Sequence, residues 1–136
     1  MSLILLDTDV ASFIFKGSSY ALPYQPLIEG NQIVLSFMTV AELFQWTELR
    51  QWGDRRRAQL TEYLYGYIII PTDIQLCQRW AEVRAQRQRI GKPIAAQDAW
   101  VAATALRHDI PLITHNRKDF ADIPNLRCLH PDISQD

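Results

Sequence analysis

The stretch Leu3-Ile4-Leu5-Leu6-Asp7-Thr8-Asp9 opens with four consecutive apolar residues and ends in two acids and a threonine. A short, continuous apolar run is typical of a strand buried on both faces, as in a parallel sheet covered by helices. Aspartate and threonine favour the position where a helix begins. The stretch therefore predicts a buried strand that ends at Asp7 and leads directly into a helix.

The same pattern of a short apolar run followed by a helical segment recurs along the chain. Further strands are expected at residues 32–36, 67–70, 110–114 and 126–129. Helices are expected from residue 39 onward, from the polar segment 52–57 up to residue 65, and at residues 73–89 and 96–108. Strands that alternate with helices predict an α/β fold, a three-layer sandwich around a central, mostly parallel sheet.

Size and composition favour one domain without a membrane segment. The 136 residues, 48% of them hydrophobic, are enough for one core, and we expect a single domain over residues 1–136. No stretch approaches the roughly 20 apolar residues needed to span a bilayer. Only two cysteines are present, without a second pair for a metal site, and nothing at the N-terminus is typical of secretion. A cytoplasmic location is therefore expected.

Several acids are expected to meet at one edge of the sheet. Asp7, Glu42 and Asp119 closely follow predicted strands, and the carboxyl ends of parallel strands border a shared crevice. Asp98, in the first turn of the 96–108 helix, joins them if that helix begins beside the crevice. Carboxylates within about 4–6 Å of one another repel unless cations neutralise them. Mg²⁺ prefers oxygen ligands, and a metal-bound water hydrolyses phosphodiesters, so the pattern favours a metal-dependent hydrolase.

Each of these side chains also has an ordinary structural explanation. Asp7 or Asp9 could cap the helix that follows the first strand. Glu42 and Asp98 could be first-turn acids, each stabilised by the helix dipole by roughly 0.3–1 kcal/mol. Asp119 could be an exposed loop acid. Their joint placement at one sheet edge is what favours the metal site.

Four segments resemble the PIN-domain ribonucleases, specifically the VapC toxins of bacterial toxin–antitoxin pairs. They are LLDTDV at 5–10, SFMTVAEL at 36–43, DAWVAATA at 98–105 and LITHNRKDF at 112–120. The resemblance extends from residue 3 to about residue 130. It implies a PIN-like fold and a Mg²⁺- or Mn²⁺-dependent endoribonuclease that cleaves RNA.

The resemblance also assigns roles within the site. Asp7 and Asp98 are the expected principal metal ligands, and Glu42 is expected to bind metal or orient the attacking water. Thr8 and Thr114 are the expected supporting polar groups. These roles come from the resemblance and not from spacing.

The chain departs from the fullest acidic pattern of the family at one position. A fourth acid often follows the last motif strand where Asn116 stands here, and Asp119 is the candidate substitute, counted with the catalytic acids. An amide can accept a bond but brings no charge to offset a divalent ion. We therefore expect one tightly bound metal. The resemblance further implies a homodimer, a VapB-like antitoxin that blocks the active site, and structured RNA such as tRNA as substrate.

RNA binding must come from local basic clusters, because the net charge of the chain is −1. Arg55, Arg56 and Arg57, with Arg50 nearby, are the better candidates to meet phosphates. A second basic group on the 73–89 helix and its following turn has the composition of a solvated helix face. The four tryptophans are interpreted as core or subunit-interface residues, and the three histidines as scattered loop residues.

Two other classes of protein share parts of the pattern. In a haloacid-dehalogenase-like phosphatase Asp7 would be the covalent nucleophile, assisted by Ser36 and Lys92. That interpretation lacks a paired-acid motif late in the chain. In a non-enzymatic, receiver-like signalling module Asp73 would be the residue after the third strand that accepts a phosphoryl group. That interpretation leaves the segments 39–42 and 98–104 unexplained.

Overall fold

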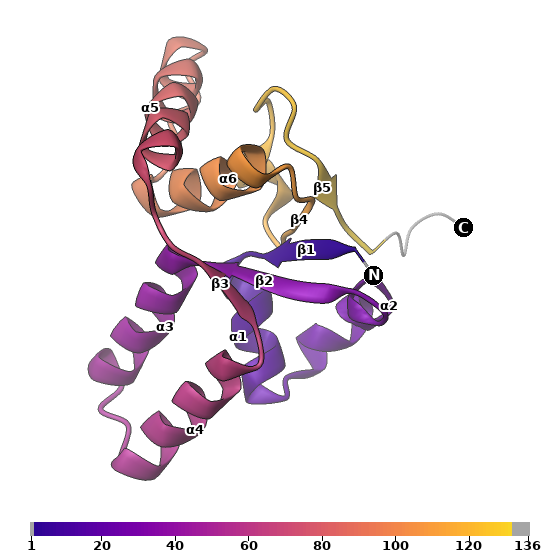
Figure 1. The fold of residues 1–136 in the computed structure, drawn as a ribbon, viewed down its shortest axis with the longest axis vertical. Coiled ribbons are helices and arrows are strands. Elements are labelled where there is room, and N and C mark those ends of the chain that lie inside the picture. Colours follow the sequence, from indigo (N-terminus) through magenta and orange to yellow (C-terminus); the bar gives the residue numbers. More distant parts are fainter. Residues whose placement is uncertain (1, 132–136) are drawn as a thin grey trace.

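Five parallel strands form one sheet in the order β3-β2-β1-β4-β5 (Figure 1). The strands are β1 (Leu3–Leu6), β2 (Gln32–Ser36), β3 (Ile68–Ile70), β4 (Leu112–Ile113) and β5 (Cys128–Leu129). The computed structural model describes residues 2–131. The predicted domain limits, residues 1 and 136, therefore lie outside the described residues, together with residues 132–135.

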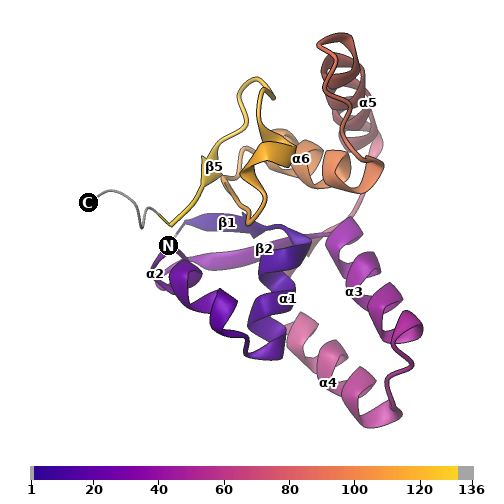
Figure 2. The same ribbon diagram turned by 180° about the vertical axis from the view of Figure 1, so that it is seen from behind.

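Helices cover both faces of the sheet. They are α1 (Thr8–Lys16), α2 (Gln25–Ile28), α3 (Phe37–Leu49), α4 (Asp54–Tyr65), α5 (Ile74–Arg89) and α6 (Ala96–His108), with 3₁₀ turns η1 (Ser19–Tyr24) and η2 (Arg117–Phe120). Figures 1 and 2 show α1 to α4 on one side of the sheet and α5 and α6 on the other. The predicted three-layer α/β sandwich is confirmed, and the described sheet is entirely parallel.

The apolar run of β1 explains why both faces are covered. Ile4 and Leu6 pack in a core cluster with residues of α1, α3 and α4, whereas Leu5 packs with residues of α5 and α6 on the opposite face. Alternate residues of a strand point to opposite faces, so a continuous apolar run requires a core on each side. All three side chains are at most 2% exposed. β1 is also the central strand, which places the residue that follows it in the middle of the sheet edge.

The structure differs from the sequence prediction in several short elements. α3 begins at Phe37, two residues early, because the Ser36 hydroxyl accepts hydrogen bonds from the amides of Met38 and Thr39 at 3.1 and 3.2 Å. β4 is shorter than predicted, and the loop after it forms η2. η1 and α2 were not predicted. Within residues 2–131, no helix combines the length and apolar character that crossing a bilayer requires.

Candidate active site

Asp7 is fixed at the carboxyl end of the central strand by three hydrogen bonds. It is the N-cap of α1, and its Oδ1 accepts from the amide of Val10 at 2.9 Å. Its Oδ2 accepts from the Thr114 hydroxyl at 2.5 Å and from the His115 amide at 3.2 Å. Burial raises the pKa of the Asp7 carboxyl, and the Thr114 hydroxyl opposes that effect. Asp7 is thus both the N-cap of α1 and the expected site residue, and its three hydrogen bonds hold the side chain in one orientation.

Glu42 is held by the first residue of α1. The Thr8 hydroxyl donates to Glu42 Oε1 at 2.7 Å and lies 3.1 Å from the Thr39 hydroxyl. Burial raises the pKa of Glu42, the Thr8 bond lowers it, and the charge of Asp9 raises it. Thr8 therefore orients Glu42, as Thr114 orients Asp7. Both threonines that the sequence singled out contact an expected site acid.

Asp98 carries the strongest sign of crowding among the acids. It lies in the first turn of α6. Burial raises the pKa of Asp98 to about 6, with further contributions from the charges of Asp119, Glu42, Asp7 and Asp9. The shift is upward although the helix dipole at this position favours an ionised carboxylate. The acids therefore lie near enough for their charges to act on Asp98, although they do not enclose one point within residues 2–131.

Asp9 belongs to this group, although the sequence suggested only a capping role for it. Its Oδ2 accepts a hydrogen bond from the Asn116 side-chain amide at 2.6 Å. The Asn116 backbone amide in turn donates to the Thr114 hydroxyl at 3.0 Å. Asn116, which stands where the family often has an acid, is thus hydrogen-bonded through its side-chain amide to a carboxylate from α1. The sequence feature that could have indicated a site role for Asp9 is its position as the second acid of the Asp-Thr-Asp triplet.

His115, which the sequence analysis interpreted as a scattered loop residue, lies in a loop that contacts the site. Its backbone amide binds Asp7, and its ring Nδ1 lies 2.8 Å from the Tyr24 hydroxyl. The ring packs edge-on against Phe13 with centroids 5.1 Å apart. The loop after β4 is thereby anchored to α1 and η1. Tyr24 had no sequence signal, because a tyrosine in an unpredicted 3₁₀ turn carries no recognisable pattern.

The donor set suits a hard divalent cation. All the converging side chains offer carboxylate oxygens, which Mg²⁺ prefers. Within residues 2–131, however, no three His, Cys, Asp or Glu side chains stand close enough to enclose an ion. Mg²⁺ usually keeps several waters and binds through one or two carboxylates plus substrate phosphate. An open group of acids is compatible with this mode of binding, but Asp7, Asp98 and Glu42 do not form a preassembled three-ligand site.

The arginine run at the start of α4 divides into different roles. Arg57 donates to the carbonyl of Trp52 at 2.7 Å and to that of Thr47 at 3.2 Å, and it pairs with Glu48. It therefore closes the α3–α4 hairpin and is not free to bind phosphate, which corrects its assignment as an RNA-binding candidate. Arg55 and Arg56 are exposed.

The second basic group is only partly the solvated helix face that the sequence predicted. Arg87 is buried and donates to three backbone carbonyls, while Lys92 pairs with Asp122 and Arg79 with Glu82. These contacts engage three of its five cations, whereas Arg84 and Arg89 form no ion pair within residues 2–131.

Comparison with known proteins agrees with the fold. The chain matches the PIN domain family over residues 4–126. Ribonuclease VapC1 of Haemophilus influenzae (strain R2866) is 28% identical over 128 residues, which cover 90% of this chain and 93% of that protein. The tRNA(fMet)-specific endonuclease VapC of Shigella flexneri is 22% identical over 123 residues, with the same two coverages.

A solved relative shares the architecture. The structure of VapBC-1 from nontypeable Haemophilus influenzae superposes with a TM-score of 0.77 at 26% identity, covering 96% of this chain and 98% of that chain. The resemblance to VapC proteins inferred from four short segments is confirmed by these matches. Because the family match spans nearly all of the described residues, the chain belongs to the PIN domain family.

Proposed function

We propose that the protein is a Mg²⁺- or Mn²⁺-dependent endoribonuclease and the toxin of a VapBC-type toxin–antitoxin pair. The observation that carries the proposal is the Asp7 carboxylate, which Thr114 and His115 hold at the end of the central strand, near acids of α1, α3, α6 and η2. Membership of the PIN domain family and two VapC relatives with nuclease names support it.

Different side chains would have different roles in phosphodiester hydrolysis. A bound divalent ion supplies a water of lowered pKa and offsets the charge that develops on the phosphate. Asp7 and Asp98 would hold the ion, because Asp7 is fixed by three donors and Asp98 is surrounded by other acids. Glu42, held by Thr8, would orient the attacking water. Asp119 and Asp9 add negative charge at the rim.

The partners follow from the relatives. VapBC-1 is named for both members of a pair, so a VapB-like antitoxin is the proposed inhibitor of this chain. The Shigella flexneri relative is named for tRNA(fMet), which makes a tRNA the first substrate to try. A homodimer is proposed as well.

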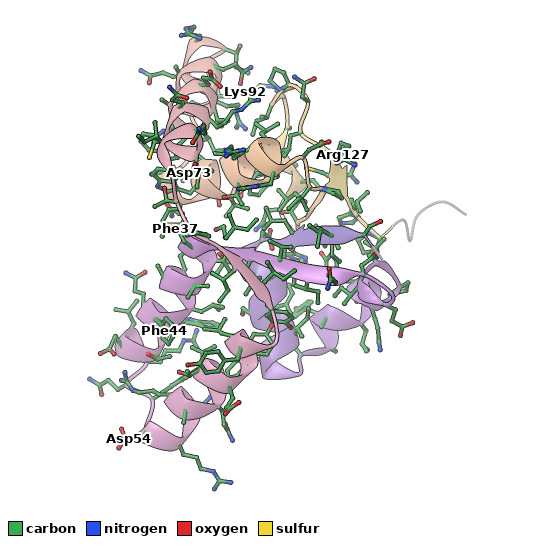
Figure 3. All side chains as sticks on the ribbon, in the orientation of Figure 1. Phe37, Phe44, Asp54, Asp73, Lys92 and Arg127 are labelled. Carbon is green, nitrogen blue, oxygen red and sulfur yellow. The ribbon has the colours of Figure 1, made fainter. Side chains whose placement is uncertain are left out.

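The two rival functions lose the residues they would need. Ser36 caps α3, and Lys92 pairs with Asp122 beyond the end of α5 (Figure 3), so neither supports Asp7 as a phosphatase nucleophile. Asp73 caps α5 and binds Arg107, which occupies the carboxylate that a receiver module would phosphorylate.

Removing the metal tests the proposed reaction. Purified protein, freed of any antitoxin, is incubated with total bacterial RNA in Mg²⁺, in Mn²⁺ and in EDTA, and the new RNA ends are mapped. We expect discrete cleavage with either ion and none in EDTA, with recovery when Mg²⁺ is restored. Cleavage that persists in EDTA would rule out a metal-dependent reaction, and absence of cleavage by folded protein in both ions, with tRNA included, would rule out the nuclease.

The hydroxyl that orients Asp7 gives a second, milder test. In Thr114→Val the Asp7 Oδ2 loses its short bond. Losing a residue that orients a metal ligand typically lowers activity by about 10–100-fold, and we expect that loss in the cleavage rate at fixed Mg²⁺. Thr104→Val is the matched control, because Thr104 is equally buried but donates only to the Trp100 carbonyl of its own helix. Equal activities of the two variants would contradict the assigned role of Thr114.

A further inference from the structure

A groove leads away from the acids between α1 and α3. It has a volume of about 240 Å³ and extends from Thr8, Asp9 and Glu42 at the candidate site to Trp46 and Leu49. Figure 2 shows α1 beside the α3–α4 hairpin along this direction. A substrate bound at the acids therefore has a preformed path along α1.

Three cations gather at the far end of this groove. The Lys16 ammonium lies 3.8 Å from the centre of the Trp46 ring, and the Arg50 guanidinium lies 4.8 Å from the same ring. Arg56 lies 4.1 Å from the ring of Trp52, whose centre is 6.0 Å from that of Trp46. The cations come from α1, from the end of α3 and from α4, so the fold brings them together. We call Lys16, Arg50 and Arg56 the cationic trio.

No ion pair neutralises the trio within residues 2–131, although the charge of Asp9 acts on Lys16 and raises its pKa. None of its members takes part in an ion pair there, whereas the neighbouring Arg57 is paired with Glu48. The charges of Arg50 and Arg56, after burial, lower the pKa of Lys16. The aromatic rings relieve part of the repulsion, because a cation over a tryptophan face is attracted by it. An anion in contact with all three charges would relieve the rest.

We propose that the cationic trio binds backbone phosphates of an RNA strand that runs from the active site along the groove between α1 and α3. This inference rests on the proposed function. Lys16 is eight residues along α1 from Thr8, or about 12 Å at 1.5 Å per residue, which a short run of single-stranded nucleotides spans. The trio thus holds the strand beyond the point of cleavage.

The charges at the two ends of the groove favour RNA over an acidic protein segment. An acidic peptide in the groove would bring its carboxylates against Asp9 and Glu42, which repel them. An RNA strand meets that end through a phosphate that shares a divalent ion with the acids. Phosphate contacts by Lys and Arg dominate affinity for nucleic acid without regard to sequence.

Binding of RNA and its salt dependence test the proposal directly. The probe is a fluorescently labelled single-stranded RNA oligonucleotide of mixed sequence, titrated in EDTA so that cleavage does not interfere. The variants are the triple Lys16→Gln/Arg50→Gln/Arg56→Gln and a triple of equal charge on α5, Arg79→Gln/Arg84→Gln/Arg89→Gln. For single strands each phosphate contact contributes about 0.7 to the slope of log affinity against log salt concentration. Loss of the trio should therefore reduce the slope by about 2 and weaken binding at low salt by at least about tenfold.

The outcomes separate this inference from the proposed function. The proposal is supported if the slope is smaller in the trio variant but not in the α5 variant. Binding should also return when Arg50→Lys/Arg56→Lys replace the two glutamine substitutions at these positions. Wild-type slopes in a trio variant whose protein still cleaves RNA overturn it and leave the nuclease intact. Loss of antitoxin binding with unchanged RNA binding overturns it in favour of a protein interface. Wild-type protein that neither binds nor cleaves RNA overturns both.

Discussion

Replacing Asp98 with asparagine is expected to abolish RNA cleavage while making the metal-free protein more stable. The carboxylate supplies charge to a metal site, and a metal contributes several kcal/mol to transition-state stabilisation, so cleavage should fall on the order of a thousandfold. Burial of the same carboxylate, together with the charges of Asp119, Glu42 and other acids, raises the pKa of Asp98 to about 6. Removing its charge removes both the cost of burying it and that repulsion.

The gain in stability depends on pH in a defined direction. A carboxyl whose pKa is higher in the folded protein than in the unfolded chain destabilises the fold when it is ionised, and the penalty vanishes when both states are protonated. For Asp98 the penalty is absent below about pH 4 and complete above about pH 6. The shift corresponds to roughly 3 kcal/mol, which solvent screening of this half-buried group reduces to about 1–2 kcal/mol. Urea unfolding in EDTA at pH 4 and pH 8 measures the difference between wild type and Asp98→Asn.

Asp54→Asn provides the matched control for that experiment. Asp54 is also a first-turn acid, but it is exposed at the far end of the α3–α4 hairpin (Figure 3). Its replacement should leave cleavage unchanged and cost about 0.3–1 kcal/mol, because it loses only the helix dipole. If Asp98→Asn behaved like Asp54→Asn, Asp98 would be an ordinary first-turn acid and the site assignment would fail.

Replacing Arg87 with methionine is expected to cause the largest loss of stability outside the apolar core. Arg87 is 5% exposed and donates to the carbonyls of Lys92, Asp119 and Ala121 at 2.7, 2.9 and 2.9 Å. Each hydrogen bond from a charged donor contributes about 1.5–3 kcal/mol, and buried carbonyls left without a partner cost more. The free energy of unfolding should fall by about 3–5 kcal/mol.

The Arg87 variant also tests whether η2 supports the site. Two of the lost bonds hold the backbone at Asp119 and Ala121, so the charge of Asp119 should no longer be fixed near Asp98. Arg84→Met on the same helix is the control, because its guanidinium only lies over Trp80 and should contribute about 0.5–1 kcal/mol. Urea unfolding curves of both variants give the comparison. Similar midpoints would show that the carbonyl contacts of Arg87 do not stabilise the loop.

Elements with strong local patterns were predictable from the sequence. The apolar run of β1 and the helix at Ala96–His108 have the bounds that were predicted, because uninterrupted apolar residues and good helix formers leave few alternatives. η1 and α2 were missed, since residues 19–28 contain Pro23 and Pro26 and show no periodicity. Short elements of this kind are set by tertiary contacts, such as the bond between Tyr24 and His115.

The site was predictable as a set of acids but not as a network. Asp7, Glu42 and Asp98 were expected at one sheet edge from their positions after predicted strands and in a helix first turn, and the family resemblance supplied their roles. The bond between Asp9 and Asn116 joins residues 107 positions apart, which no local pattern encodes. The same holds for Arg57, whose role in the hairpin depends on the carbonyls of Trp52 and Thr47. The metal-binding roles of Asp7, Glu42 and Asp98 remain predictions for the experiments above.

The strand order has a consequence for how the protein is made. β1 leaves the ribosome before β4, with which it pairs although β4 lies more than a hundred residues later in the chain. Until residues 112–115 have emerged, one edge of β1 is unpaired and Asp7 Oδ2 lacks both the Thr114 hydroxyl and the His115 amide. The two parts of the site are therefore translated more than a hundred residues apart. Under the proposed function, a chain that stops before residue 112 lacks both donors to Asp7 and is expected not to cleave RNA beside the ribosome that is making it.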